Sequence, residues 1–257
     1  MKRKQNNNED NYYYTRTRKK GVLGLGIILS FFALTIVFGF LLSPLFGVGY
    51  LGNLFSSDYK KCVKTCYAVV CTSELEDETS ATKLAQNLRS RGGAGIIEKV
   101  DKNYIVYLGI YLTKKDANLV CENLKEQNFE SSVTELKIYK PRINDLTSEE
   151  QDNFNKSFDF LIESIDTIYT LLHQFETDEI TNLTLNLRLN ALVLSAEYYN
   201  QKLIESSSDL IKELNTIMAS VASILKYVAD EETLTNNSFP YASEVRRCLA
   251  RITLMLV

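Results

Sequence analysis

The segment Tyr104–Ile138, YIVYLGIYLTKKDANLVCENLKEQNFESSVTELKI, carries two strand patterns on either side of one helix pattern. Tyr104–Leu108 is rich in aromatic and β-branched residues, and Ser132–Ile138 alternates polar with apolar residues, so both predict strands. Between them, four small or apolar side chains recur at the spacing of one helical face: Ala117, Val120, Cys121 and Leu124. The segment therefore predicts a strand–helix–strand unit.

The same three patterns occur once more upstream. Tyr67–Cys71 precedes Tyr104–Leu108 by 37 residues, and Gly95–Val100 predicts the second strand of this copy. The helix pattern of this upstream copy consists of Ala81, Leu84, Ala85 and Leu88, and it lies 36 residues before the pattern that starts at Ala117. Turn-prone residues end each helix, at Arg91–Gly93 and at Gln127–Asn128. The two copies together predict one four-stranded sheet with two helices on one face.

The second copy resembles the SPOR domain, a bacterial domain of cell-division, sporulation and cell-wall proteins. The resemblance rests on three stretches, Tyr104-x-Val106-x-Leu108-Gly109-x-Tyr111, Thr113-x-x-Asp116-Ala117 and Leu124-Lys125. It covers about 70 of the 257 residues, and the first copy matches loosely. The resemblance implies a βαββαβ fold and non-catalytic binding of peptidoglycan glycan strands that lack stem peptides, at division septa.

Side chains along a strand alternate between the two faces of a sheet. The residues expected to face the two helices are Tyr67, Val69, Cys71, Tyr104, Val106 and Leu108. Those expected on the opposite face, which is the glycan groove in the SPOR family, include Ala68, Val70, Ile105 and Tyr107. By this resemblance the candidate glycan-binding residues are Val70, Thr72, Ser73, Ile105 and Tyr107.

This second face departs from the family pattern. Family members often carry glutamine at the position of Val70, and arginine or another polar residue at those of Ile105 and Tyr107. Sugar recognition needs donors, acceptors and an aromatic platform, and here only Tyr107 offers a platform. The alternative is that the apolar face is covered by the carboxy-terminal helices or by a partner protein.

The stretch from Gly21 to Ser57 contains no charged residue, and its first part reads GVLGLGIILSFFALTIVFGFLL. At about 1.5 Å per helical residue this is long enough to cross a hydrocarbon core of roughly 30 Å. It predicts an uncleaved transmembrane helix over 21–43. A cleaved signal peptide, whose apolar region spans about 7–15 residues, and a buried core helix are the alternatives.

Charge predicts the orientation of this helix. Residues 1–20 hold seven basic and two acidic side chains, whereas the whole chain has a net charge of −3. The positive-inside rule then places the amino terminus in the cytoplasm and the later domains outside it. The basic tail is also expected to meet membrane lipid, and no nucleic acid is expected because its basic residues stop where the apolar run begins.

Residues 147–257 predict an antiparallel helical bundle. Thr147–Glu150 has the form of a capping box, and a last helix is expected at about Ala242–Leu256. The first predicted apolar stripe is Phe154, Phe158, Leu161, Ile165, Ile168, Leu172 and Phe175. The second is Ile180, Leu183, Leu187, Leu194 and Tyr198, and the third is Leu210, Leu214, Ile217, Val221, Ile224 and Val228. The bundle either docks a partner or merely buries its own stripes.

Little in the sequence predicts catalysis or a metal. Cys62-x3-Cys66-x4-Cys71 lacks zinc spacing, so neither metal nor cofactor is expected. Candidate disulfides join Cys71 with Cys121 and Cys62 with Cys66, with buried free thiols as the alternative. His173 is the single histidine, and there is no Gly-x-Ser-x-Gly elbow, so no enzyme is predicted.

These observations predict an α/β+α protein of five parts. They are a disordered basic cytoplasmic tail (1–20), a transmembrane helix (21–43), a linker (44–65), a SPOR-like domain (66–140) and a helical domain (147–257). The predicted function is non-catalytic attachment to peptidoglycan glycan strands at the septum in division or sporulation. The alternative is a membrane-anchored scaffold that binds another envelope protein through the sheet face and the carboxy-terminal helices, with glycan binding lost.

Overall fold

The computed structural model of the protein describes residues 61–230 and 238–257, all of which belong to one compact unit, Phe46–Val257. The predicted tail (1–20), the predicted transmembrane helix (21–43) and most of the predicted linker lie outside the described residues. Among the helices that are described, none combines the length and the apolar character needed to cross a membrane. The membrane anchor therefore stays a prediction.

Four strands form one antiparallel sheet, in the spatial order β2-β3-β1-β4. Their bounds are β1 (Lys61–Leu75), β2 (Ile96–Val100), β3 (Asn103–Tyr111) and β4 (Ser131–Lys140). β1 is longer than the strand predicted at Tyr67–Cys71, because it also pairs with the carboxy-terminal half of β4. The central position of β1 and β3 puts most of the candidate residues in the middle of the sheet.

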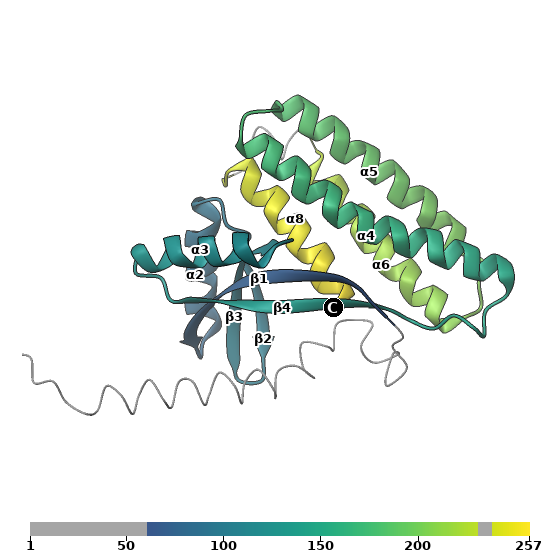
Figure 1. Ribbon diagram of the computed structural model, residues 1–257, viewed down its shortest axis with the longest axis horizontal. Coiled ribbons are helices and arrows are strands. Elements are labelled where there is room, and N and C mark those ends of the chain that lie inside the picture. The colour runs from purple at the N-terminus through teal and green to yellow at the C-terminus, as the bar shows by residue number, and fades with distance from the viewer. Residues whose placement is uncertain (1–60, 231–237) are drawn as a thin grey trace, which may run out of the picture. The chain divides into compact units, whose positions relative to one another are not determined.

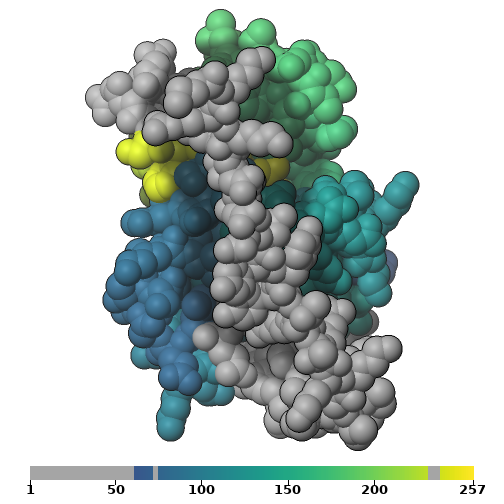
Figure 2. All heavy atoms as spheres, turned by 90° about the vertical axis from the view of Figure 1, so that its left-hand side faces the viewer, coloured from purple at the N-terminus to yellow at the C-terminus, as the bar shows by residue number. Residues whose placement is uncertain are grey.

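Two helices, α2 (Glu78–Ser90) and α3 (Lys114–Glu126), connect the strands and pack on one face of the sheet (Figure 1). Each begins with a capping side chain: Asp77 accepts a hydrogen bond from the Ser80 amide, and Thr113 accepts one from the Asp116 amide. Figure 2 looks onto these two helices, whose blue and teal atoms lie on the surface. The order β1-α2-β2-β3-α3-β4 confirms the predicted βαββαβ fold.

The turn after α2 requires a glycine at position 95. Gly95 has a φ of +55°, and a Cβ there would lie 2.5 Å from the Ala85 carbonyl oxygen. Because that neighbour is backbone, no other residue fits without moving the helix end. Gly95 follows the Arg91–Gly93 turn predicted from the sequence, and carbonyl oxygens of this region accept hydrogen bonds from the last helix of the chain.

The sheet face beneath α2 and α3 buries the side chains that were predicted to point there. Val69, Cys71, Val106 and Leu108 are buried in one cluster with residues of both helices, and we name this cluster the α2–α3 core. Tyr67 and Tyr104 are half-buried at its edge. The predicted period of two is therefore confirmed for these residues. Beyond Leu108 a β-bulge shifts the register of β3, so that Ile110 lies on the same face as Tyr107.

Four longer helices follow: α4 (Ser148–Glu176), α5 (Asn182–Leu203), α6 (Asp209–Val228) and α8 (Tyr241–Leu256). They pack as a bundle, as predicted, in which α4 contacts each of the others (Figure 1). The predicted capping box is present, with Thr147 and Glu150 bonding each other's backbone. The predicted stripes of α4 and α6 are buried apart from Phe175 and Leu210, which are half-buried.

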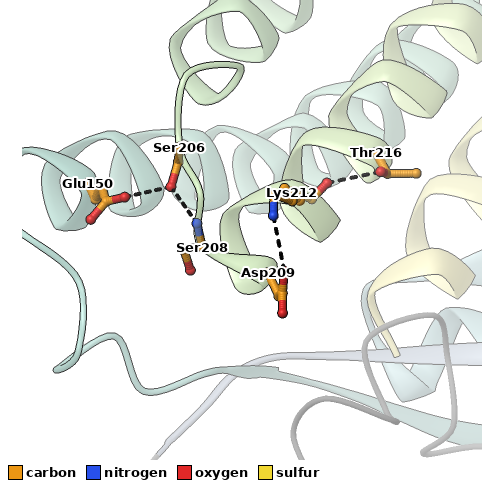
Figure 3. Close-up of polar contacts among 6 residues, drawn as sticks. All are labelled: Glu150, Ser206, Ser208, Asp209, Lys212 and Thr216. Atoms are coloured by element: carbon orange, nitrogen blue, oxygen red, sulfur yellow. Dashed lines mark hydrogen bonds and ion pairs between the residues drawn. The ribbon is translucent and has the colours of Figure 1, made fainter.

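The connection between α5 and α6 is fastened to the start of α4 (Figure 3). The Ser206 hydroxyl donates to Glu150 Oε1 over 2.5 Å and accepts from the Ser208 amide over 3.1 Å. The Ser206 and Thr147 hydrogen bonds lower the pKa of Glu150, because they favour its charged form. The connection thus closes one end of the bundle.

The predicted stripe of α5 is wrong. Leu183, Leu187, Leu194 and Tyr198 are 67%, 61%, 68% and 55% exposed. The residues that face the bundle are instead Leu185, Leu189, Val193 and Ala196. The helix is apolar on two opposite faces, so its periodicity fits two stripes equally and does not identify the buried one.

Candidate functional site

The candidate site is the sheet face that points away from α2 and α3. Val70 and Tyr107 lie opposite each other across the β1–β3 pair, and Ile105 lies on the same face of β3. Thr72 and Ser73 belong to β1, but their side chains fall outside the described residues. The structure thus brings together the three candidate residues whose side chains it describes.

The helical bundle covers this face. Tyr107 is 0% and Val70 8% exposed, and both belong to one continuous cluster with residues of α4 and α8, among them Phe158 and Val245. We name this cluster the bundle core. Figure 1 shows α8 running across the sheet on the side away from α2 and α3, and α8 packs against β2 and β3. The carboxy-terminal helices are therefore what covers the apolar face, in agreement with the alternative drawn from the sequence.

Tyr107, the predicted aromatic platform, is turned inward. Its hydroxyl donates a hydrogen bond to Glu98 Oε2 over 2.5 Å. Burial raises the pKa of Tyr107, and the nearby Glu98 carboxylate raises it further because it opposes a second negative charge. In the described conformation the ring is buried and presents no face to a sugar.

Polar contacts hold α8 against the turn that follows α2. The Ser243 hydroxyl donates to the Gly93 carbonyl over 2.7 Å, in a buried position. Arg246 donates to the Gly92 carbonyl and pairs with Glu176, and Arg247 donates to the Gly95 carbonyl over 3.4 Å. We name these three side chains, with the ion pair described next, the α8 latch.

The ion pair of the latch joins Arg89 of α2 to Glu244 of α8. Glu244 is 1% exposed and Arg89 18%, so the pair is largely removed from water. Removing one partner of such a pair leaves the other charge without compensation, which is costly. The latch therefore fixes where α8 sits on the SPOR-like unit.

Sequence reasoning identified the Arg91–Gly93 turn but missed its role. A turn after a helix leaves carbonyl oxygens without helical partners, and α8 supplies donors to them. The signal in the sequence is the run Ser243-Glu244-Val245-Arg246-Arg247. It places polar and charged residues on α8 next to apolar residues that are buried. Nothing in that run alone indicates its partner.

Further polar contacts join α4 to the strands and helices of the SPOR-like unit. Lys64 of β1 pairs with Asp166 over 2.5 Å, and Lys140 of β4 pairs with Asp159 over 2.8 Å. The Tyr169 hydroxyl donates to Asp116 at the start of α3 over 3.0 Å. Partly exposed ion pairs of this kind contribute roughly 0–1 kcal/mol each. The bundle core and the α8 latch therefore contribute most of the stability of the contact between the bundle and the sheet.

The cysteines are separate thiols, four of them buried and Cys62 exposed. Cys71 and Cys121 lie in the α2–α3 core, as expected from the strand and helix patterns. Burial raises the pKa of Cys71 to about 11, with the nearby Cys121 as a second cause. Since the thiolate is the reactive form, such a thiol oxidises slowly. The Cys71–Cys121 and Cys62–Cys66 disulfides stay predictions.

Over the described ranges, no group of three His, Cys, Asp or Glu side chains could hold a metal ion. His173 is exposed near the end of α4. An open groove between α4 and α5 is lined by Asp166, Thr170, Gln174 and Arg188, and its lining has no histidine or second carboxylate that could activate a threonine hydroxyl. These arrangements offer binding surfaces and no evident catalytic constellation.

Comparison with known proteins supports the family resemblance. The family model of the SPOR domain matches residues 69–135, from β1 into β4, which is about a quarter of the chain. A similar solved structure is the solution structure of the peptidoglycan binding domain of the B. subtilis cell wall lytic enzyme CwlC. It shares 24% identity with a TM-score of 0.27, over 30% of this chain and 95% of that one. No curated protein matches the chain.

Proposed function

We propose that the protein is a non-catalytic protein of the bacterial cell envelope that binds peptidoglycan glycan strands. The observation that carries this proposal is the match of residues 69–135 to the SPOR domain, on a complete βαββαβ unit with the expected side chains on each face. Peptidoglycan binding in general is what the SPOR resemblance implies. A role at the septum, in division or sporulation, is the finer part of the proposal.

The membrane anchor is a further part of the proposal. The uncharged run from Gly21 to Ser57 and the basic residues before it support a single-pass anchor with a cytoplasmic amino terminus. In that arrangement the SPOR-like unit and the bundle face the peptidoglycan.

The covered face sets a condition on glycan binding. Among its fully buried side chains are Tyr107, Ile110, Leu136 and Ile138. Burying a large apolar side chain contributes about 1.5–3 kcal/mol, so exposing these four costs roughly 6–12 kcal/mol, as an upper estimate. That rivals the whole stability of a typical domain, about 5–15 kcal/mol. The open form is therefore rare, and the apparent affinity of this face for glycan falls by the same fraction.

A second candidate is a scaffold that binds another envelope protein and has lost glycan binding. The observation that favours it is the same burial: Val70, Ile105 and Tyr107 are apolar or inward-facing where the family often has polar residues. In this case the SPOR-like unit carries the bundle, and the partner contacts exposed helix surfaces, because the sheet face is occupied.

Glycan co-sedimentation separates the two candidates. The full-length chain is mixed with glycan strands stripped of stem peptides, or with intact peptidoglycan as a control. Arg246→Ala removes part of the α8 latch and raises the open population, because it loses a part-buried hydrogen bond to the Gly92 carbonyl and the ion pair with Glu176. Hydrogen bonds to charged groups contribute about 1.5–3 kcal/mol each. Arg188→Ala removes the same charge from α5, away from the sheet, and is the matched control.

The glycan proposal predicts weak binding by the native chain, at least fivefold tighter binding by Arg246→Ala, and no change with Arg188→Ala. Absence of binding by all three chains would overturn it in favour of the scaffold. If the native chain binds glycan as tightly as Arg246→Ala does, the protein binds glycan through a surface other than the covered face.

A further inference from the structure

Helix α5 presents a row of apolar side chains to solvent. The described residues include seven large hydrophobic side chains that are exposed, and four of these lie on this one helix, at Leu183, Leu187, Leu194 and Tyr198. With the exposed Ala191 between them, we name this set the α5 stripe. Steps of four, four, three and four residues keep its members on one side of the helix. Scattered exposed leucines are ordinary, whereas an ordered row of them marks an interaction surface.

The bundle does not need this stripe. The opposite side of α5 supplies Leu185, Leu189, Val193 and Ala196 to the bundle core, where the helix meets α4 and α6. The ring of Tyr199 on that side packs against Phe160, with centroids 5.1 Å apart. α5 is therefore held in place by one face, and no other described helix or strand covers its second apolar face.

The residues of the α5 stripe are spaced so that they match those of a second α5 helix that runs in the opposite direction. In an antiparallel pair of α5 helices, Leu187 of one copy lies opposite Leu194 of the other. The same register brings Leu183 opposite Tyr198, and its centre falls between Asn190 and Ala191. In this register Ala191 of one copy lies opposite the exposed Asn190 of the other, and these two side chains are short enough for the helix axes to approach to roughly 8–10 Å. Such a self-complementary surface is what a twofold dimer requires.

Charge favours the antiparallel over the parallel arrangement. Exposed Asp178 and Glu179 precede α5, and exposed Lys202 lies in its last turn. An antiparallel pair brings the acidic start of one α5 near the basic end of the other, while a parallel pair would bring like charges together. Opposed helix dipoles add to this preference. The flanking Arg188, which donates to Gln174 of α4 over 3.3 Å, supplies a polar rim.

A lipid surface is a poorer fit for the stripe. Helices that lie on membranes carry many lysine and arginine side chains around their apolar face. α5 has only Arg188 and Lys202, together with the acidic Glu197.

We propose that the α5 stripe is a homodimer interface, in which the α5 helices of two copies pack antiparallel. One helix face buries less area than a standard interface, so the dimer is expected to be weak and dependent on concentration. The proposal does not depend on glycan binding, because the stripe and the covered sheet face are separate surfaces.

Cysteine cross-linking of the full-length chain in mild detergent tests the interface. The exposed Cys62 is first replaced by serine, and Ala191→Cys then places a thiol beside the expected twofold axis. Leu119→Cys on α3 is the matched control, because Leu119 is 55% exposed and lies off the stripe. Covalent dimer from Ala191→Cys, at least tenfold above Leu119→Cys, is the expected result. Equal yields from the two variants would overturn the proposal.

Orientation is tested by mixing chains that carry Leu183→Cys with chains that carry Tyr198→Cys. Mixed dimers support the antiparallel register, and dimers formed mainly between two Leu183→Cys chains would overturn it.

In the chain with Ala191→Cys, Leu187→Glu should reduce cross-linking at least tenfold, whereas Leu119→Glu should leave it unchanged. Labelling of Ala191→Cys by a thiol reagent confined to lipid, without cross-linking, would overturn the dimer and assign the stripe to a membrane surface.

Discussion

The covered sheet face and the α5 stripe are both rows of apolar side chains on regular elements, yet their surroundings differ. Tyr107 and Ile138 on the sheet are 0% exposed beneath the bundle, whereas Leu187 and Leu194 on α5 are more than 60% exposed. The difference teaches that apolar character indicates a surface to be covered and does not identify the cover. In one place the chain covers its own surface, and in the other we propose that a second copy does.

The largest expected effect compares one residue from each surface. Ile138→Ala leaves a cavity in the bundle core and should lower the free energy of unfolding by about 2–5 kcal/mol. Leu187→Ala removes an exposed side chain and should change it by less than about 0.5 kcal/mol. Urea unfolding of dilute protein measures both. A loss of several kcal/mol with Leu187→Ala would mean that the stripe is buried in the folded monomer.

A smaller effect is expected from the latch. Glu244→Ala leaves Arg89 largely buried without its partner and should cost roughly 3 kcal/mol. Asp209→Ala breaks an ion pair with Lys212 whose two side chains are 86% and 59% exposed, and should cost less than about 1 kcal/mol. Similar costs for the two variants, again by urea unfolding, would mean that the latch does not hold α8 on the sheet.

Thiol titration should affect stability only at high pH. Burial raises the pKa of Cys66 to about 11 and that of Cys248 to about 12, from an ordinary value of 9.0. The folded state therefore favours the neutral thiols, and their contribution is complete below pH 9 and is lost as the pH rises toward 11–12. The midpoint of urea unfolding should fall over that range, and less steeply in Cys248→Ser.

Thiol labelling compares exposed and buried positions at neutral pH. Cys62 and Cys66 lie four residues apart in β1, but only Cys62 is exposed. A thiol reagent should label Cys62 at least a hundredfold faster than Cys66, because the buried thiol has little thiolate and little access. Mass spectrometry of partly labelled protein measures the ratio. Equal rates would show that β1 and its cover open frequently.

Much of the SPOR-like unit could be predicted from local patterns. The alternation through Val69 and Val70 assigned one side chain to each face, and the helix spacing through Ala117 and Leu124 identified the buried side of α3. Such patterns succeed because side-chain direction follows from backbone geometry within a few residues. The same rule failed for α5, where two apolar stripes satisfy one helical period.

The candidate site could be predicted only in part. Val70, Ile105 and Tyr107 were assigned to one face correctly, but whether that face is open was left between two alternatives. The answer lies in contacts between residues far apart in the chain, such as Ser243 and Gly93, which are 150 residues apart.

The sequence by itself determined the order of strands and helices, the faces of the sheet and the apolar character of the surface opposite α2 and α3. Only the tertiary structure decided that α8 and α4 cover that surface and that α5 keeps one apolar face exposed. The physical reason is that the periodicity of apolar residues reflects the local backbone, whereas the covering of an apolar face depends on which distant helix packs against it. Docking in turn depends on donors such as Arg246 meeting carbonyls that a distant turn leaves without partners.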